Sequence, residues 1–151
     1  MAASSLRKKQ QQRVGYRLSG GDDDDGSSGG VLWLVEDNTM VLLGGEVWPS
    51  AFGMAEAIEA RLLVQQSSEA PPPSIIVELG AGVGLCGLVA AAAVRRRPQQ
   101  HQQQHGPCRV YLTDESPELV AINAGLFRTE WLGSSSSSPS LDVTVEVGGL
   151  D

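Results

Sequence analysis

A glycine-rich turn after a short apolar segment carries the residues best suited to hold a small molecule. Residues 77–85 read VELGAGVGL, so the carboxylate of Glu78 is followed by Gly80, Ala81 and Gly82. Glycine lets the backbone bend sharply and approach a ligand because it has no Cβ. A carboxylate at the end of an apolar strand is costly unless it is paired or bound. Any nucleotide-type ligand would therefore lie at the carboxyl end of this strand, near the N-terminus of the next helix.

The spacing of the glycines leaves three interpretations open. A dinucleotide site uses G-x-G-x-x-G to lay a pyrophosphate against the helix dipole, and counted from Gly80 the third position is Leu85. Counted from Gly82, the pattern through Gly84 and Gly87 fits, but its first glycine lies later than a turn directly after the strand would place it. The second interpretation is a different nucleotide-type cofactor, and the third is a tight strand–helix turn without a ligand.

Alternating strand and helix patterns surround this turn. The continuously apolar, β-branched run at 74–79 is typical of a strand buried on both faces of a parallel sheet. Apolar residues at helical spacing predict a helix from Ala51 to about Gln65, with Ser50 as its N-cap. The further elements that we expect are a short hairpin or two edge strands at 31–35 and 40–43, helices at 84–94 and 116–126, and strands at 109–113 and 141–147. This order is the β-α-β-α-β half of a doubly wound nucleotide-binding fold, which places the chain in the α/β class.

Polar, low-complexity segments flank and interrupt these elements. Residues 1–30 hold a basic, glutamine-rich start, glycine and serine spacers and the run Asp22–Asp25. They carry too little apolar surface to offset the entropy of ordering, so we expect a disordered polar tail. The folded domain then covers 31–151, with low-complexity insertions at about 98–107 and 133–140.

Composition excludes several classes of protein. The 151-residue chain has a formal net charge of -7, which argues against binding nucleic acid, because phosphate contacts need clustered Lys and Arg. Its apolar runs are far shorter than the roughly 20 residues that cross a bilayer. Cys86 and Cys108 show no ligand spacing, so we expect a reducing compartment. Consecutive carboxylates at Asp22–Asp25 are not preorganised, and His101 and His105 lie in a glutamine tract, so we expect no metal site.

Taken in order along the chain, these motifs resemble the seven-β-strand S-adenosylmethionine-dependent protein-lysine methyltransferases. The resemblance rests on ELGAGVGL at 78–85, preceded by GEVWPSA at 45–51 and a helix, and followed by LTD at 112–114 with Leu119 and Asn123 downstream. It spans roughly Val31 to Asp151, and the combination in order is more specific than any single motif. It implies a Rossmann-like methyltransferase fold, of which this chain would hold the first three strands of the parallel sheet plus an N-terminal hairpin and helix.

The resemblance also implies roles for individual residues. The family positions that surround the methionine part of the cofactor match Glu78, Gly80, Ala81 and Gly82. Asp114 would accept hydrogen bonds from the two ribose hydroxyls, which suits a carboxylate, although it could instead cap the helix near Pro117. Trp48 would line the cofactor pocket, although packing alone is the commoner role of an isolated Trp. Asn123 we expect to be structural, through a local hydrogen bond.

The reaction that the resemblance implies is in-line transfer of the sulfonium methyl group to the ε-amine of a lysine in a protein. Holding a neutral amine close to the methyl carbon supplies much of the acceleration, so we assign no catalytic residue. The protein substrate would be, by resemblance only, a chaperone, an elongation factor or a calmodulin-like protein. We expect a monomer in the cytoplasm, with the nucleus as the alternative, and no nucleic acid or membrane as partner.

The chain departs from the family at its end. Family members continue past the third strand into a loop that contacts adenine and a fourth strand with an acidic-x-x-aromatic element, whereas this sequence ends at Asp151. We therefore expect the cofactor-binding N-terminal half of such an enzyme, which by itself binds S-adenosylmethionine weakly. Two alternatives stay open: an NAD-type dinucleotide-binding fragment, and a non-catalytic interaction remnant of a methyltransferase.

Overall fold

A parallel sheet of three strands carries the glycine-rich turn. The computed structural model describes residues 11–19, 30–37, 44–66, 73–96, 106–132 and 143–149. Their elements are β1 (Gln11–Arg17), β2 (Val31–Asp37), α1 (Pro49–Gln66), β3 (Ile75–Leu79), α2 (Leu85–Arg95), β4 (Cys108–Asp114), α3 (Pro117–Phe127), a π-helical turn (Arg128–Leu132) and β5 (Val143–Gly149). The strand order is β3-β4-β5, with α2 between the first two strands in sequence and α3 between the last two. The expected α/β class and β-α-β-α-β order are confirmed.

The register of the parallel strands brings two predicted site residues to the same edge of the sheet. Glu78 of β3 lies opposite Leu112 of β4, and Leu79 lies opposite Thr113. Each strand therefore ends beside the other, and the turn after β3 faces Asp114 at the end of β4. This is the carboxyl edge at which open α/β sheets bind their ligands.

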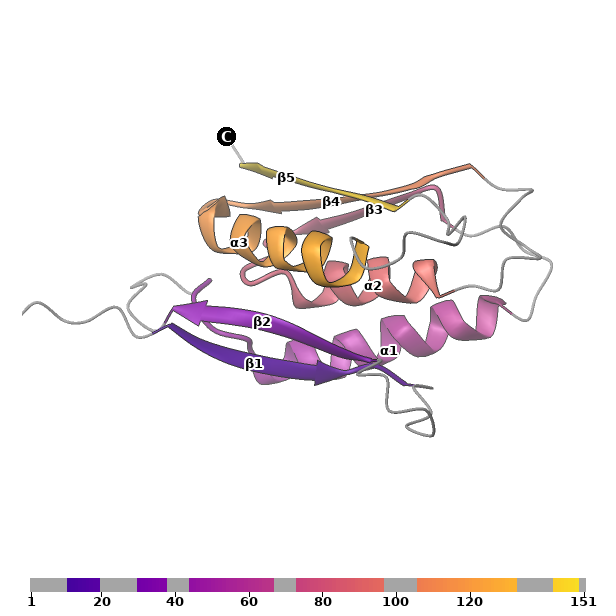
Figure 1. Ribbon diagram of the computed structural model, residues 1–151, viewed down its shortest axis with the longest axis horizontal. Helices are drawn as coiled ribbons and strands as arrows, with labels where there is room; N and C mark the ends of the chain where they lie inside the picture. The colour runs from indigo at the N-terminus through magenta and orange to yellow at the C-terminus, as the bar shows by residue number, and fades with distance from the viewer. Residues whose placement is uncertain are drawn as a thin grey trace, which may run out of the picture.

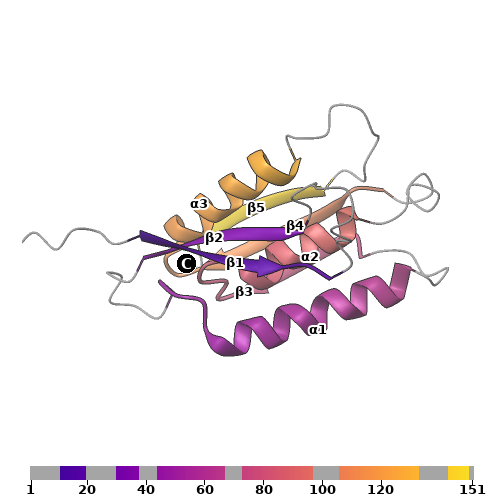
Figure 2. The same cartoon turned by 60° about the horizontal axis from the view of Figure 1, so that its bottom comes forward.

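The elements form three layers, with α2 and α3 in the middle one (Figure 1). The sheet lies on one side of α2 and α3, and the antiparallel β1–β2 hairpin lies on the other side. Figure 2 shows the hairpin between α3 and α1, with α2 behind it. Because α2 meets the sheet, the hairpin and α1, nine of its eleven residues are buried, including the run Ala90–Ala93. A helix that is apolar on all sides is expected only where it is enclosed in this way.

Strand β1 corrects the prediction for the N-terminal tail. Residues 11–17 pair antiparallel with 31–37, so the expectation of a disordered tail is wrong for residues 11–19. The alternate apolar residues Val14, Tyr16 and Leu18 turn inward, and the last two are only 6% and 2% exposed. The intervening Gly15 and Arg17 face solvent. Because inward apolar residues alternate with these, the mean hydropathy of the segment is low and its composition does not indicate a strand. Gly30 is also described, and its carbonyl accepts the N–H of Leu18, whereas residues 1–10 and 20–29 lie outside the described residues.

The bounds and partners of several other predicted elements differ from the structure or lie outside its described residues. The first helix begins at Pro49, which is favourable in a first helical turn, so Ser50 lies inside the helix and is not its N-cap. The partner of β2 is β1, and the expected strand at 40–43 lies outside the described residues. Residues 98–105 and 133–140 of the expected insertions also lie outside them.

Strand β3 is more exposed than the sequence predicted. Ile75, Val77 and Leu79 are 60%, 55% and 73% exposed, so burial of the strand on both faces is wrong in this structure. The reason is its position: β3 is an edge strand of the described sheet, and only its alternate residues Ile76 and Glu78 are partly buried.

Helix α2 approaches the sheet so closely that position 87 requires glycine. A Cβ at Gly87 would collide with Leu112 Cδ2 and lie 2.7 Å from Glu78 Oε2. Leu112 is fully buried and cannot move aside without disturbing the core. We expect Gly87→Ala to lower the free energy of unfolding by about 1–3 kcal/mol, as measured by urea denaturation followed by circular dichroism.

Gly125 in α3 provides the matched control. Nothing lies within 4 Å of a Cβ built there, so Gly125→Ala should raise the free energy of unfolding by about 0.5–1 kcal/mol through helix propensity alone. Equal effects of the two alanine substitutions would contradict the close approach of α2.

Candidate functional site

A cavity of about 680 Å³ lies at the carboxyl edge of β3 and β4. Its walls come from the segment before α1, the first turns of α1, the turn between β3 and α2, and the segment after β4. The residues predicted from the sequence that line it are Trp48, Glu78, Gly80, Ala81, Gly82 and Asp114. The structure therefore brings all six together around one space.

The turn after β3 is fixed by backbone hydrogen bonds. The N–H of Ala81 donates to the carbonyl of Thr113 at 2.9 Å, which ties the turn to the end of β4. Gly80 and Gly82 have φ values of 65° and 55°, in the left-handed region that favours glycine. At Gly80 a Cβ would meet nothing within 4 Å, so its requirement for glycine is one of backbone conformation.

Asp114 closes the turn from the neighbouring strand. Its Oδ2 accepts the N–H of Gly82 at 2.7 Å, and its Oδ1 accepts the N–H of Ser116 at 2.9 Å. Ser116 is the N-cap residue of α3, so this bond reaches no N–H inside the helix and does not cap it, contrary to the alternative role for Asp114. Each carboxylate oxygen has a second lone pair, so both oxygens can accept a further donor from the cavity.

Glu78 lies beneath the first turn of α2. Its Oε2 accepts the N–H of Gly87 at 2.8 Å, and within the described residues no donor reaches Oε1. Burial raises the pKa of Glu78 from 4.5 to about 7; the Gly87 N–H opposes this shift, and the charge of Asp114 adds to it. The side chain therefore exchanges its proton near neutral pH and becomes charged readily when a cation enters the cavity.

Trp48 stands at the mouth of the cavity. It is 52% exposed and precedes α1 directly, where its carbonyl accepts the N–H of Ala51 at 2.8 Å. An indole ring exposed at the rim offers an apolar and cation-attracting surface. Burial in the core, the alternative role for this Trp, is not what the structure shows.

The sequence analysis missed further lining residues. They are the carboxylates Glu46 and Glu115 and the side chains Met54 and Cys86. Met54 lies one turn after Ser50 in α1, and Cys86 lies in the first turn of α2, so their places in the helix turns next to the cavity were the available signal. Burial raises the pKa of the Cys86 thiol to about 11, and the charge of Glu78 adds to this, so the thiol stays protonated.

Asn123 has a different role from the one expected. It is fully buried and structural, but its partners are Val35 and Val83, 88 and 40 residues away in sequence. The prediction of a local hydrogen bond is therefore wrong. No periodicity or spacing in the sequence indicates these contacts.

The lining of the cavity selects the charge of its ligand. Among the described residues, four carboxylate side chains line it and no Lys or Arg does. The N–H groups of Gly82 and Gly87, which a phosphate would need, already donate to Asp114 and Glu78. The cavity therefore offers hydrogen-bond acceptors and negative charge, which fit a cationic ligand with hydroxyl groups better than a pyrophosphate.

The fold and the cavity together define a Rossmann-like protein with an acidic site at the carboxyl edge of its sheet. The sequence model of one protein family, described as lysine methyltransferase, matches residues 27–128, which is more than half of the chain. The chain belongs to this family, and its α/β architecture is the Rossmann-like methyltransferase fold, as the resemblance predicted. No curated protein matches the chain.

The described residues hold neither a membrane-spanning helix nor a cluster of metal ligands. No helix in the described part of the chain is long and apolar enough to cross a bilayer. In the same part, no three His, Cys, Asp or Glu side chains gather as metal ligands. Asp22–Asp25, His101 and His105 lie outside it.

The raised pKa of Glu78 makes the stability of the fold depend on pH. The folded protein keeps the Glu78 proton up to about pH 7, whereas the unfolded chain releases it near pH 4.5. The Glu78 contribution to stability is thus fully present below pH 4.5 and is lost as pH rises towards 7. Over that window we expect the free energy of unfolding to fall by up to about 3 kcal/mol relative to Glu78→Gln.

Urea denaturation between pH 4.5 and 8 measures this difference. Glu56→Gln, an exchange on the exposed face of α1, serves as the control and should run parallel to the wild type. A Glu78→Gln curve that also runs parallel to the wild type would rule out the shifted pKa.

Proposed function

We propose that the cavity binds S-adenosylmethionine and that the chain serves methyl transfer to a lysine side chain of a protein. The observation that carries this proposal is the acidic cavity at the turn between β3 and α2 in a chain of the lysine methyltransferase family. S-adenosylmethionine carries a sulfonium and an ammonium cation together with two ribose hydroxyls. The carboxylates that line the cavity can attract the two cations and accept hydrogen bonds from the ammonium group and the hydroxyls.

In this proposal the six predicted residues divide the cofactor between them. Glu78 and the turn at 80–82 face the methionine part, where the free Oε1 of Glu78 can accept the ammonium group. Asp114 accepts the ribose hydroxyls with its remaining lone pairs. Trp48 covers the mouth of the cavity with its ring. When bound, the cofactor supplies an electrophilic methyl group.

In this proposal the described cavity residues position the cofactor and the acceptor lysine, and none of them attacks the methyl group as a nucleophile. Cys86 is the one lining side chain among them with a thiol, and its raised pKa keeps it protonated at neutral pH. The methyl group would therefore pass directly to the acceptor lysine, whose amine must be neutral and aligned. The acceptor that we propose is a lysine-bearing protein, with a chaperone, an elongation factor or a calmodulin-like protein as the classes suggested by the resemblance.

A dinucleotide is the competing ligand. The glycine pattern from Gly82 through Gly87 allows it, but the carboxylates that hold the Gly82 and Gly87 N–H groups would have to release them to a pyrophosphate. Negative charge on Asp114, and on Glu78 once it has lost its proton, also repels phosphate. The charge of the cavity thus favours S-adenosylmethionine over NAD.

Isothermal titration of the full 151-residue chain with S-adenosylmethionine and with NAD tests the proposal. We expect binding of S-adenosylmethionine alone, and Asp114→Ala should weaken it about 10- to 100-fold through loss of charge-assisted hydrogen bonds. Circular dichroism would verify that the variant is folded. Glu118→Gln, an exposed exchange outside the cavity, should bind as the wild type does.

Transfer of labelled methyl groups to protein acceptors, recovered as ε-methyllysine, tests the reaction itself. Binding without transfer to any acceptor would favour a non-catalytic methyltransferase relative. Binding of NAD but not of S-adenosylmethionine would replace the proposal with a dinucleotide site.

A further inference from the structure

Two buried polar side chains connect the β1–β2 hairpin with opposite walls of the cavity. The hairpin lies on the far side of α2 and α3 from the sheet, and none of its strand residues lines the cavity (Figure 1). Glu36 in β2 is 5% exposed, and Asn123 in α3 is fully buried against the same strand. Both lie outside the site described above, and both reach backbone groups at its edge.

Glu36 holds the wall that carries Trp48. Its Oε1 accepts the N–H of Val47 at 2.6 Å, and its Oε2 accepts Nε2 of Gln12 in β1 at 2.6 Å. The next residue of β2 adds a backbone bond, in which the N–H of Asp37 donates to the carbonyl of Gly45 at 2.9 Å. Val47 and Trp48 both line the cavity, so β2 fixes the backbone of this wall.

Asn123 holds the wall formed by the glycine turn. Its Oδ1 accepts the N–H of Val35 at 2.7 Å, and its Nδ2 donates to the carbonyl of Val35 at 3.0 Å. The same Nδ2 donates to the carbonyl of Val83 at 2.9 Å, directly after the turn at 80–82. Only a side-chain amide offers one acceptor and two donors in this arrangement. Asn123 thus links β2 to the end of the turn.

We propose that Glu36 and Asn123 are positioning residues of the cofactor site, which set the Trp48 wall and the glycine turn at a fixed separation through β2. This inference rests on the proposed function for the identity of the ligand, but its structural part concerns the ligand-free chain. A cavity with preset walls orders fewer groups when it binds, so loss of either link weakens binding without removing a ligand contact.

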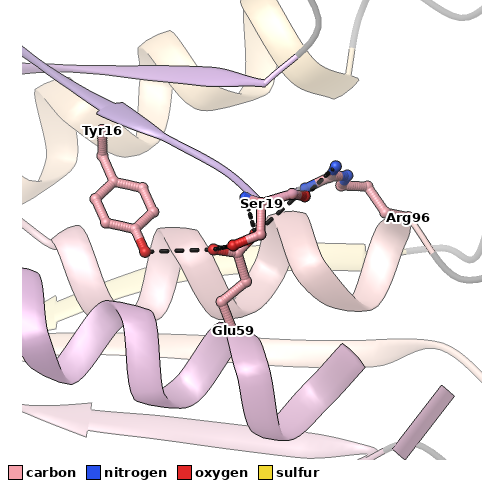
Figure 3. Close-up of polar contacts among 4 residues, drawn as sticks. All are labelled: Tyr16, Ser19, Glu59 and Arg96. Atoms are coloured by element: carbon pink, nitrogen blue, oxygen red, sulfur yellow. Dashed lines mark hydrogen bonds and ion pairs between the residues drawn. The ribbon is translucent and has the colours of Figure 1, made fainter. Parts of the chain in front are cut away.

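A cluster around the buried carboxylate of Glu59 provides a matched control on the same hairpin (Figure 3). Glu59 of α1 is fully buried and accepts Tyr16 Oη at 3.3 Å and the N–H and Oγ of Ser19 at 2.7 and 3.1 Å. Arg96 lies 3.3 Å from Glu59 and donates to the carbonyl of Ser19 at 2.6 Å. This cluster fastens the hairpin to α1 and α2, yet none of its four residues lines the cavity.

Amide hydrogen exchange of the full, ligand-free chain is the first measurement. In Glu36→Ala we expect exchange at 45–48 to speed up about tenfold or more, and in Asn123→Ala the same at 80–84. Glu36→Gln keeps an acceptor for Val47 and should restore slow exchange at that wall. Glu59→Gln should leave both segments within about twofold of the wild type. Each alanine variant tests the link to one wall, so the measurement can be made with either variant if the other does not fold.

Titration with S-adenosylmethionine is the second measurement. We expect the Kd to rise about tenfold in Glu36→Ala and in Asn123→Ala, and to stay within about twofold of the wild type in Glu59→Gln. Unchanged exchange at both walls, or an equal rise in Glu59→Gln, overturns the positioning role even where the wild type binds the cofactor. Faster exchange at both walls in a chain that binds no S-adenosylmethionine supports the links and overturns the proposed function instead.

Discussion

The close approach of α2 to the strand ends is the constraint on which the site depends. Gly87 has no side chain, and this absence lets its N–H reach Glu78 while Leu112 packs against the same turn of the helix. The contact buries a carboxyl group under a helix start and raises its pKa towards neutrality. It also fixes the path of the preceding turn, whose Gly82 is held from the other side by Asp114. Gly87 is therefore needed both for the close packing of α2 on β4 and for the hydrogen bond that holds Glu78.

The sequence predicted the central part of the fold because its signals are local. The run at 74–79 and the helices on either side of it show periodicities that survive in the structure with shifts of one or two residues. Strand β1 was missed because its inward residues, among them Tyr16, alternate with polar ones in a segment of low overall hydropathy. The exposure of β3 depends on which elements surround the strand, and a single strand pattern carries no information about its neighbours.

The candidate site divides in the same way. Glu78, the turn at 80–82 and Asp114 follow from strand ends that the motif places side by side, because neighbouring parallel strands finish at one edge. Glu36 and Asn123 could not be predicted, since their partners lie in distant segments and their spacing follows no secondary-structure period. Six of the residues that line the cavity are readable from the sequence, whereas other lining residues such as Glu46 and Met54, and the residues that hold its walls, become visible only in three dimensions.

The exposed side of β3 has a consequence for the behaviour of the chain in solution. Ile75, Val77 and Leu79 form a row of apolar side chains on a strand whose outer edge has no described partner strand. A row of exposed apolar side chains of this kind favours contact with another molecule. A charged residue in place of Val77 would interrupt the row without touching the cavity.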